Sequence, residues 1–170
     1  YKTEILELLP DRQDRKFQSE IKETDRLPSV VFPLSAAQKQ FCFLDQLDEN
    51  SRQAYVDQVC LELEGIFDFQ AMEQAIPKIL ERHEALRTKI SSERDFQEVL
   101  PESTIEIPLI DFSNVLLQER EDKVTEWLEG KIKKPFNLEQ VPLWRVYILK
   151  LEETLHRLVL RIHHIINDGL

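Results

Sequence analysis

The sequence predicts an α/β (α+β) fold in two layers, with a mostly antiparallel mixed sheet and helices packed on one face. Stretches that alternate apolar and polar residues, as half-buried strands do, occur irregularly between amphipathic helical patterns. Neighbouring strand patterns are joined by short loops, which favours antiparallel pairing. The chain has 170 residues, of which 42% are hydrophobic and 32% charged, and this suffices for one domain with a proper core.

Residues 1–28 are predicted to form a linker or approach segment ahead of a folded unit that spans residues 29–170. A short apolar patch at residues 5–9 is followed by a highly charged stretch that ends at Pro28. A loosely docked helix is the alternative interpretation. Because the chain begins with Tyr1 and stops one residue after an Asp-Gly pair, we expect it to be a piece of a longer protein.

The stretch SAAQKQFCFLDQL predicts a helix that begins after Ser35. The Ser35 hydroxyl can cap this helix, and Gln38, three residues later, completes a capping box. The apolar face is expected to consist of Ala37, Phe41 and Leu44, widened by Phe43 and Leu47.

A half-buried strand and a second helix follow. Residues 54–65 alternate apolar and polar side chains, and Gly65 closes the strand. Asp68 can cap a helix over residues 71–86, in which Pro77 should either cause a kink or shift the start of the regular part. The side chains expected to face inward are Val59, Leu61 and Leu63 on the strand and Ala71, Ala75, Ile79 and Leu80 on the helix.

The second half of the chain predicts five strands and one helix. Two short strand patterns flank a charged turn and form a hairpin. Pro108 places the next strand at a sheet edge, because proline cannot donate to a ladder. The helix that follows must stop before Pro135. The expected elements are strands over residues 86–90, 96–100 and 104–113, a helix within residues 114–136, and two strands within residues 143–164, joined near residues 152–154.

Composition excludes several classes of function. The net charge of −10, with acids and bases mixed along the chain, argues against a nucleic-acid partner, which would favour a basic face. No apolar run approaches the roughly 20 residues that cross a bilayer, and no signal-peptide pattern is visible, so no membrane partner is expected. Cys42 and Cys60 lack metal-type spacing and lie among apolar residues. We expect buried free thiols in a reducing compartment, hence a cytoplasmic protein.

The chain ends in RLVLRIHHIINDGL, in which two adjacent histidines follow an apolar run. Successive side chains of a strand point to opposite faces, so His163 and His164 should face different surroundings, His164 on the face of Leu160. Asp168 and Gly169 then turn the chain. A catalytic histidine and a buried, hydrogen-bonded pair are equally good interpretations of the pattern. A metal site is less favoured, because adjacent histidines diverge and Asp168 would have to be the third ligand.

A group of charged residues lies in the stretch ERHEALRTKI, where Arg82, Glu84 and Arg87 cluster at a predicted junction between helix and strand. A solvated helix end has the same composition, because the helix dipole favours cations there. The cluster taken alone therefore does not indicate a function.

Three stretches together, SAAQKQFCFLDQL, RHEALRT and HHIINDG, resemble in order and approximate spacing three core motifs of the condensation domains of nonribosomal peptide synthetases. PFNLEQVPLWRVYIL is similar to the stretch that precedes the histidine strand in that family. The resemblance identifies residues 29–170 as the N-terminal subdomain of a condensation domain. It implies a chloramphenicol-acetyltransferase-like fold, in which two similar halves form a V around a tunnel. Only the first half is matched, so we expect this chain alone to be inactive.

The resemblance implies amide-bond formation. An acyl, aminoacyl or peptidyl thioester on the phosphopantetheine of one carrier protein is attacked by the amine of an aminoacyl thioester on another. The expected partners are the upstream and downstream peptidyl carrier domains and the C-terminal half of the condensation domain. No directly bound cofactor is expected, because the phosphopantetheine of the carrier proteins brings both substrates. No metal is expected either, because the adjacent histidines diverge and no Cys or Glu has ligand spacing beside them.

The resemblance also implies roles for single residues. His164 matches the catalytic histidine, His163 the structural one, and Gly169 the glycine next to the reaction centre. The family's motif aspartate, here Asp168, forms a structural ion pair with an arginine. In this chain Arg82 is the first candidate for that arginine and Arg87 the alternative. The sequence departs from the common pattern at Gln40, where Arg is frequent, at Ile90, where Phe is frequent, and at Asn167, where Ser is frequent.

Three other functions remain open from the sequence. A related acyltransferase would use a coenzyme A thioester and a small acceptor, and a catalytically silent relative would act as a docking module. An epimerisation domain also carries the two histidines, although the first motif fits that class less well.

Overall fold

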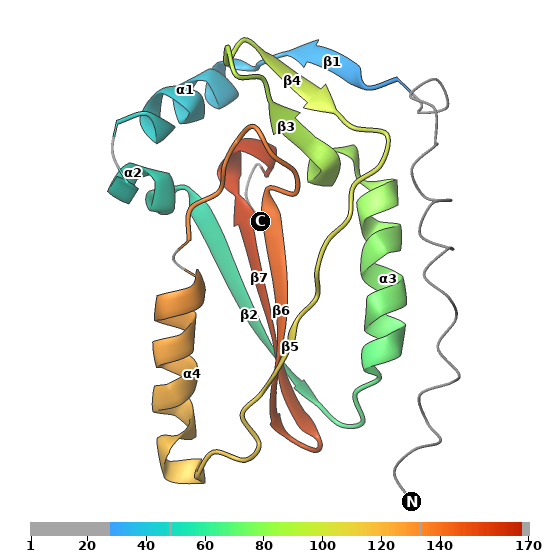
Figure 1. The fold of residues 1–170 in the computed structure, drawn as a ribbon, viewed down its shortest axis with the longest axis vertical. Coiled ribbons are helices and arrows are strands. Elements are labelled where there is room, and N and C mark those ends of the chain that lie inside the picture. Colours follow the sequence, from blue (N-terminus) through green and yellow to red (C-terminus); the bar gives the residue numbers. More distant parts are fainter. Residues whose placement is uncertain (1–27, 48, 133, 168–170) are drawn as a thin grey trace, which may run out of the picture.

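The computed structural model describes residues 28–47, 49–132 and 134–167, which are arranged around two sheets (Figure 1). The predicted linker therefore lies outside the described residues except for Pro28. The small sheet has the order β1-β4-β3, formed by β1 (Val30–Pro33), β4 (Phe96–Val99) and β3 (Thr88–Ile90). The large sheet has the order β2-β7-β6-β5, formed by β2 (Val56–Glu64), β7 (Leu155–His163), β6 (Trp144–Glu152) and β5 (Leu109–Asp111).

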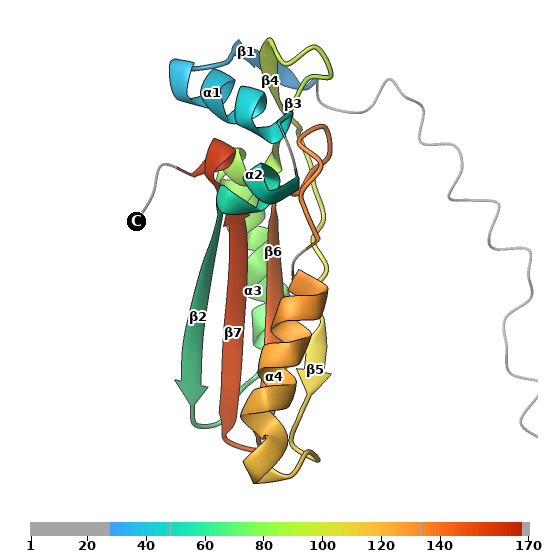
Figure 2. The same cartoon turned by 90° about the vertical axis from the view of Figure 1, so that its left-hand side faces the viewer.

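The helices divide between the two sheets. Two of them, α1 (Ala36–Asp45) and α2 (Glu49–Ala54), lie with the small sheet at one end of the large sheet (Figures 1 and 2). The longer helices α3 (Phe69–Arg82) and α4 (Leu117–Ile132) run along the large sheet. Two short 3₁₀ turns, η3 (Glu84–Arg87) and η4 (His164–Ile166), precede β3 and follow β7 respectively.

The large sheet confirms the predicted class of a mixed, mostly antiparallel α/β fold. Strand β7 pairs antiparallel with both β2 and β6, and the short edge strand β5 pairs parallel with β6. The predicted hairpins, β3–β4 and β6–β7, are both present and antiparallel. The strand expected over residues 104–113 is regular only within β5, after Pro108.

The expectation that the helices cover one face of the sheet is wrong, because α3 and α4 lie on opposite faces (Figure 2). On one face Leu80 of α3 packs in a buried cluster with Trp144 and Val146 of β6. On the other face Val124 of α4 packs in a cluster with Leu149 of β6. The physical reason is that β6 and β7 carry apolar side chains at both parities, and a sheet that is apolar on both faces needs a cover on each.

Helix α1 begins as predicted. The Ser35 hydroxyl accepts a hydrogen bond from the Gln38 backbone N–H, and the Gln38 side chain accepts one from the Ser35 backbone N–H. Its buried face, however, consists of Cys42 and Asp45. Of the predicted apolar face, Phe41 and Leu44 are half-buried, whereas Ala37, Phe43 and Leu47 are exposed.

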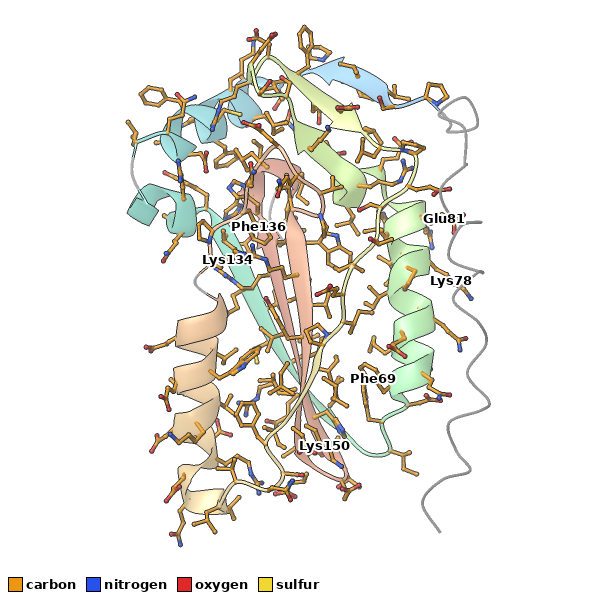
Figure 3. All side chains as sticks on the ribbon, in the orientation of Figure 1. Phe69, Lys78, Glu81, Lys134, Phe136 and Lys150 are labelled. Atoms are coloured by element: carbon orange, nitrogen blue, oxygen red, sulfur yellow. The ribbon has the colours of Figure 1, made fainter. Side chains whose placement is uncertain are left out.

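Helix α3 is capped by the Asp68 carboxylate, which accepts from the Ala71 N–H, but it starts at Phe69 and ends at Arg82. The inward side chains are Ile76 and Leu80. The polar Lys78 and Glu81 point away from the sheet (Figure 3). The sequence-based choice of Ala71, Ala75 and Ile79 as inward residues is wrong, because the pattern around Pro77 admits two neighbouring faces and only contact with the sheet selects one.

The two cysteines differ from each other. Both are free, and Cys42 is buried as expected, whereas Cys60 is exposed. Cys60 lies on β2, an edge strand of the large sheet. None of the described helices combines the length and apolar character that a membrane span requires.

Two adjacent residues of α3 test the observed packing. Leu80→Ala should lower the free energy of unfolding by about 3 kcal/mol, because it opens a cavity under the sheet. Ile79→Ala, on the solvent side of the same turn, should cost about 1 kcal/mol or less. Urea unfolding monitored by circular dichroism measures both values. Equal losses for the two variants would contradict the orientation of α3.

Candidate active site

The two histidines lie where β7 ends and η4 begins. The pairing of β2 with β7 runs as far as Val56 opposite His163, and the next backbone N–H, that of His164, donates to the Tyr55 carbonyl at 2.9 Å. The chain then leaves the strand and forms the 3₁₀ turn η4. Strand alternation therefore holds up to His163, and a change of backbone conformation, not alternation, sets the direction of His164.

His163 is a buried group that shapes the turn. Its residue is 2% exposed, its Nδ1 accepts a hydrogen bond from the Ile165 N–H at 3.0 Å, and its ring lies edge-on to Phe136. Phe136 belongs to the segment between α4 and β6, close to Lys134 (Figure 3). Burial lowers the pKa of His163 to about 4, a shift that the nearby Asp45 carboxylate opposes and that His164 assists. His163 is therefore neutral near pH 7 and acts as an acceptor.

His164 has a different environment, since its side chain is 30% exposed. The imidazole stacks on the Phe41 ring of α1, with centroids 5.9 Å apart and an interplanar angle of 12°. Its Nε2 lies 3.1 Å from Oδ1 of Asp57 on β2. The other oxygen of Asp57, Oδ2, accepts a hydrogen bond from Nδ2 of Asn167 at 3.0 Å.

A cavity of about 490 Å³ opens beside His164. Its walls come from α1, from the β3 and β4 strands and from η4. Gln38 links these walls, because its Nε2 donates to Oε1 of Gln97 at 2.9 Å and to the Ile165 carbonyl at 3.2 Å. The capping residue that the sequence identified thus also holds the turn that carries His164. A partly exposed imidazole at the wall of a cavity can accept a proton from a bound group or donate a hydrogen bond to it.

The predicted arginine motif is only partly assembled in the described residues. Arg82 is exposed at the end of α3. The Arg87 side chain is largely buried, its Nη1 donates to the Leu100 carbonyl, and its Nη2 lies 3.6 Å from Oε1 of Glu84. Asp168 and Gly169 lie outside the described residues, so the ion pair of Asp168 with Arg82 or Arg87 stays a prediction.

The sequence analysis did not predict two contacts of His164, the one with the Asp57 carboxylate and the one with the Phe41 ring. Asp57 has the same parity as the apolar Val59 and Leu61 of β2, so it is a carboxylate on the face expected to be apolar. This carboxylate at an otherwise apolar face could have indicated a functional role for Asp57. No pattern in the sequence indicated the contact of Phe41 with His164, because these residues are far apart in the chain. Within residues 28–47, 49–132 and 134–167, no group of three His, Cys, Asp or Glu side chains has the geometry of a metal site.

Comparison with models of protein families identifies the family of this chain. The family model described as Condensation domain matches residues 29–170, and the chain therefore belongs to the condensation domain family.

The proteins to which this chain is similar in sequence are much longer than the chain itself. The chain is 36% identical over 141 residues to chondramide synthase cmdD of Chondromyces crocatus, covering 82% of this chain and 4% of that protein. It is 36% identical over 143 residues to tyrocidine synthase 2 of Brevibacillus parabrevis, covering 84% of this chain and 4% of that protein. The chain thus spans only a small part of the length of these synthases.

Solved structures show the same fold. The starter condensation domain of rhizomide synthetase RzmA matches with a TM-score of 0.72 at 24% identity, over 82% of this chain and 35% of that one. The EpoB NRPS cyclization-docking bidomain from Sorangium cellulosum matches with a TM-score of 0.68 at 22% identity, over 80% of this chain and 27% of that one. At these identities the likeness supports the fold alone.

The buried His163 predicts an acid-sensitive fold. An unfolded histidine titrates near 6.5, whereas folded His163 titrates near 4, so the unfolded state binds more protons between these values. The free energy of unfolding should therefore fall as the pH decreases from about 6.5 to about 4, with about 3 kcal/mol of that loss due to His163.

The variant His163→Asn isolates this contribution, because the amide oxygen can still accept from the Ile165 N–H but does not titrate. Urea unfolding at several pH values should give a smaller slope for the variant than for the parent chain. Identical slopes would show that His163 does not cause the acid sensitivity.

Proposed function

We propose that this chain forms one wall of the reaction centre of a condensation domain that makes amide bonds in nonribosomal peptide synthesis. The single observation that carries the proposal is His164, half-exposed at a cavity, in a chain that matches the family over residues 29–170. The donor is an acyl, aminoacyl or peptidyl thioester on one carrier domain. The acceptor is the amine of an aminoacyl thioester on the next.

The chemistry requires little activation from the protein. The amine nitrogen attacks the thioester carbonyl, the C–N bond forms, the C–S bond breaks, and the leaving thiolate takes up a proton. An α-amine has an ordinary pKa of about 7.7–8.0, so part of it is neutral at physiological pH. Holding both tethered groups in register supplies several of the roughly 7–11 kcal/mol that ideal orientation can provide.

His164 has two roles in this proposal. It holds the acceptor amine next to the thioester carbonyl, and it takes the proton that the nitrogen loses as the tetrahedral intermediate forms. Positioning is the larger contribution and proton transfer the smaller. His163 keeps the turn in place, as its hydrogen bond to the Ile165 N–H supports.

The surroundings of the reaction follow from the same proposal. Both substrates arrive on phosphopantetheine arms of upstream and downstream peptidyl carrier domains, so this chain holds no cofactor of its own. The C-terminal half of the condensation domain supplies the facing wall of the tunnel. The reaction takes place in the cytoplasm, where carrier domains are loaded.

His164→Ala tests the proposal in the intact synthetase that carries this chain. The rate of amide formation should fall about 10²-fold or more, since a positioned base is worth about 10²–10⁴. The deficit should be largest at pH values where the acceptor amine is mostly ammonium and smaller above pH 8. Lys78→Ala, which removes an exposed side chain on the solvent side of α3 (Figure 3), is the control and should retain full activity. A loss below tenfold for His164→Ala would exclude an essential role.

Asp168→Ala tests the predicted structural ion pair. The variant should lose about 5 °C or more in Tm together with activity, because an arginine loses its partner. Double-mutant cycles of Asp168→Ala with Arg82→Ala and with Arg87→Ala identify that partner by the larger coupling energy. An unchanged Tm with lost activity would instead indicate that Asp168 acts on the substrate.

A further inference from the structure

The contact between His164 and Asp57 carries an inference that deepens the proposed function and rests on it. We infer that Asp57 is a positioning residue for His164: its carboxylate holds the Nε2–H of the imidazole, so that Nδ1 is the ring nitrogen that exchanges a proton with the acceptor amine.

The contact between the two groups favours one tautomer of the imidazole. Nε2 of His164 lies 3.1 Å from Oδ1 of Asp57, and an ionised carboxylate offers only lone pairs, so this contact stabilises the tautomer that carries its proton on Nε2. In the neutral imidazole the other nitrogen, Nδ1, then has the lone pair. When His164 takes up a proton, it does so at Nδ1, and the charge that forms lies next to the Asp57 carboxylate. The same logic applies to carboxylate–histidine pairs in hydrolases, where the carboxylate fixes the tautomer and stabilises the imidazolium.

Three contacts prevent the pair from rotating freely. Asp57 lies within the regular part of β2, opposite Ile162 of β7, so its backbone is fixed by the ladder. Its second oxygen is held by Asn167 Nδ2 at 3.0 Å. The imidazole is stacked on Phe41, which fixes the plane of the ring. A two-point hold on the carboxylate and a stacked ring together restrict the direction of Nδ1.

Asn167 is the second residue in contact with the Asp57 carboxylate. The amide nitrogen Nδ2 of Asn167, just after η4, donates to Oδ2 of Asp57 on β2. Asn167 therefore acts on His164 through Asp57, and the two residues form a coupled unit.

The charged surroundings of His164 are simple in the described part of the chain. Asp57 contributes from β2, and the adjacent His163 contributes an imidazole that is neutral near pH 7. The cavity beside His164 is lined by the uncharged Phe41 and Gln38 of α1 and by Thr88 of β3. Asp57 is thus the one carboxylate in contact with His164 among these residues.

The first test is spectroscopic and needs no substrate. In the ¹⁵N-labelled 170-residue chain, long-range ¹H–¹⁵N spectra should show neutral His164 with its proton on Nε2, and this proton should exchange slowly with water. Asp57→Ala should make the exchange at least about tenfold faster. Glu64→Gln, which changes another acidic side chain of β2, is the matched control and should leave the signal unchanged. A proton on Nδ1, or unchanged exchange in Asp57→Ala, would overturn the inference.

The second test is kinetic and uses the intact synthetase with its carrier domains. Asp57→Ala should lower kcat for amide formation about tenfold while KM for the carrier-bound acceptor stays within about twofold. Asp57→Asn should be intermediate, because its carbonyl oxygen still accepts from Nε2–H but bears no charge. Asn167→Ala should reduce kcat in the parent background and have no further effect in the Asp57→Ala background.

The two tests separate the inference from the function on which it rests. An intact synthetase that forms no amide from carrier-bound substrates overturns the proposed function, whatever the spectra of His164 show. Normal kcat in Asp57→Ala, in a synthetase whose His164→Ala variant is impaired, overturns the positioning role alone.

Discussion

The antiparallel pairing of β2 with β7 is the constraint on which the site depends. This ladder joins nine residues on each strand and reaches the end of β7 at His163. Tyr55, just before β2, accepts the backbone N–H of His164, so the strand pair fixes the point at which the chain turns. The same register places Asp57 opposite Ile162, within reach of the imidazole that follows. A slip of one residue would move Asp57 to the other face of the sheet and remove it from His164.

A second layer of interactions holds α1 over this turn. The buried Asp45 carboxylate, near the end of α1, lies 3.1 Å from Nη2 of Arg94 and 3.7 Å from Nε of Arg52. Arg94 also donates to the Cys42 carbonyl at 2.8 Å, and it lies in the β3–β4 turn with a positive φ of 59°. A non-glycine residue in this region is strained, so the ion pair offsets that strain. These contacts keep Phe41 and Gln38 where the cavity needs them.

The parts of the molecule that the sequence predicted are those set by neighbours in the chain. The capping box of Ser35 and Gln38 needs four residues, and the two hairpins need an alternating pattern with a turn, so both could be read directly. The inward face of α3 could not, because Ile79 and Leu80 are adjacent and equally apolar, and only the sheet decides between them. The cover on both faces of the large sheet was missed for another reason. Strands β6 and β7 carry apolar side chains at both parities, and the predicted two-layer arrangement left one of their faces without a cover.

The candidate site shows the same division. The resemblance of motifs selected His164. Strand alternation led to the expectation that the two histidines have different surroundings, which they do, but the 3₁₀ turn η4 and not alternation sets the direction of His164. The link of Asp57 to His164 and Asn167 joins positions more than one hundred residues apart in the chain, and it depends on a ladder register that periodicity does not specify. A lone carboxylate on an apolar face was visible, but its partner was not.

The hydrogen bond of His163 has a consequence for the geometry of its neighbour. The imidazole of His163 caps η4 as a serine or aspartate side chain caps the start of a helix. Its Nδ1 accepts a hydrogen bond from the backbone N–H of Ile165. This cap functions only while Nδ1 is unprotonated. A proton on that nitrogen would set two donors against each other, so the turn that carries His164 requires the neutral form of His163, which burial favours near pH 7.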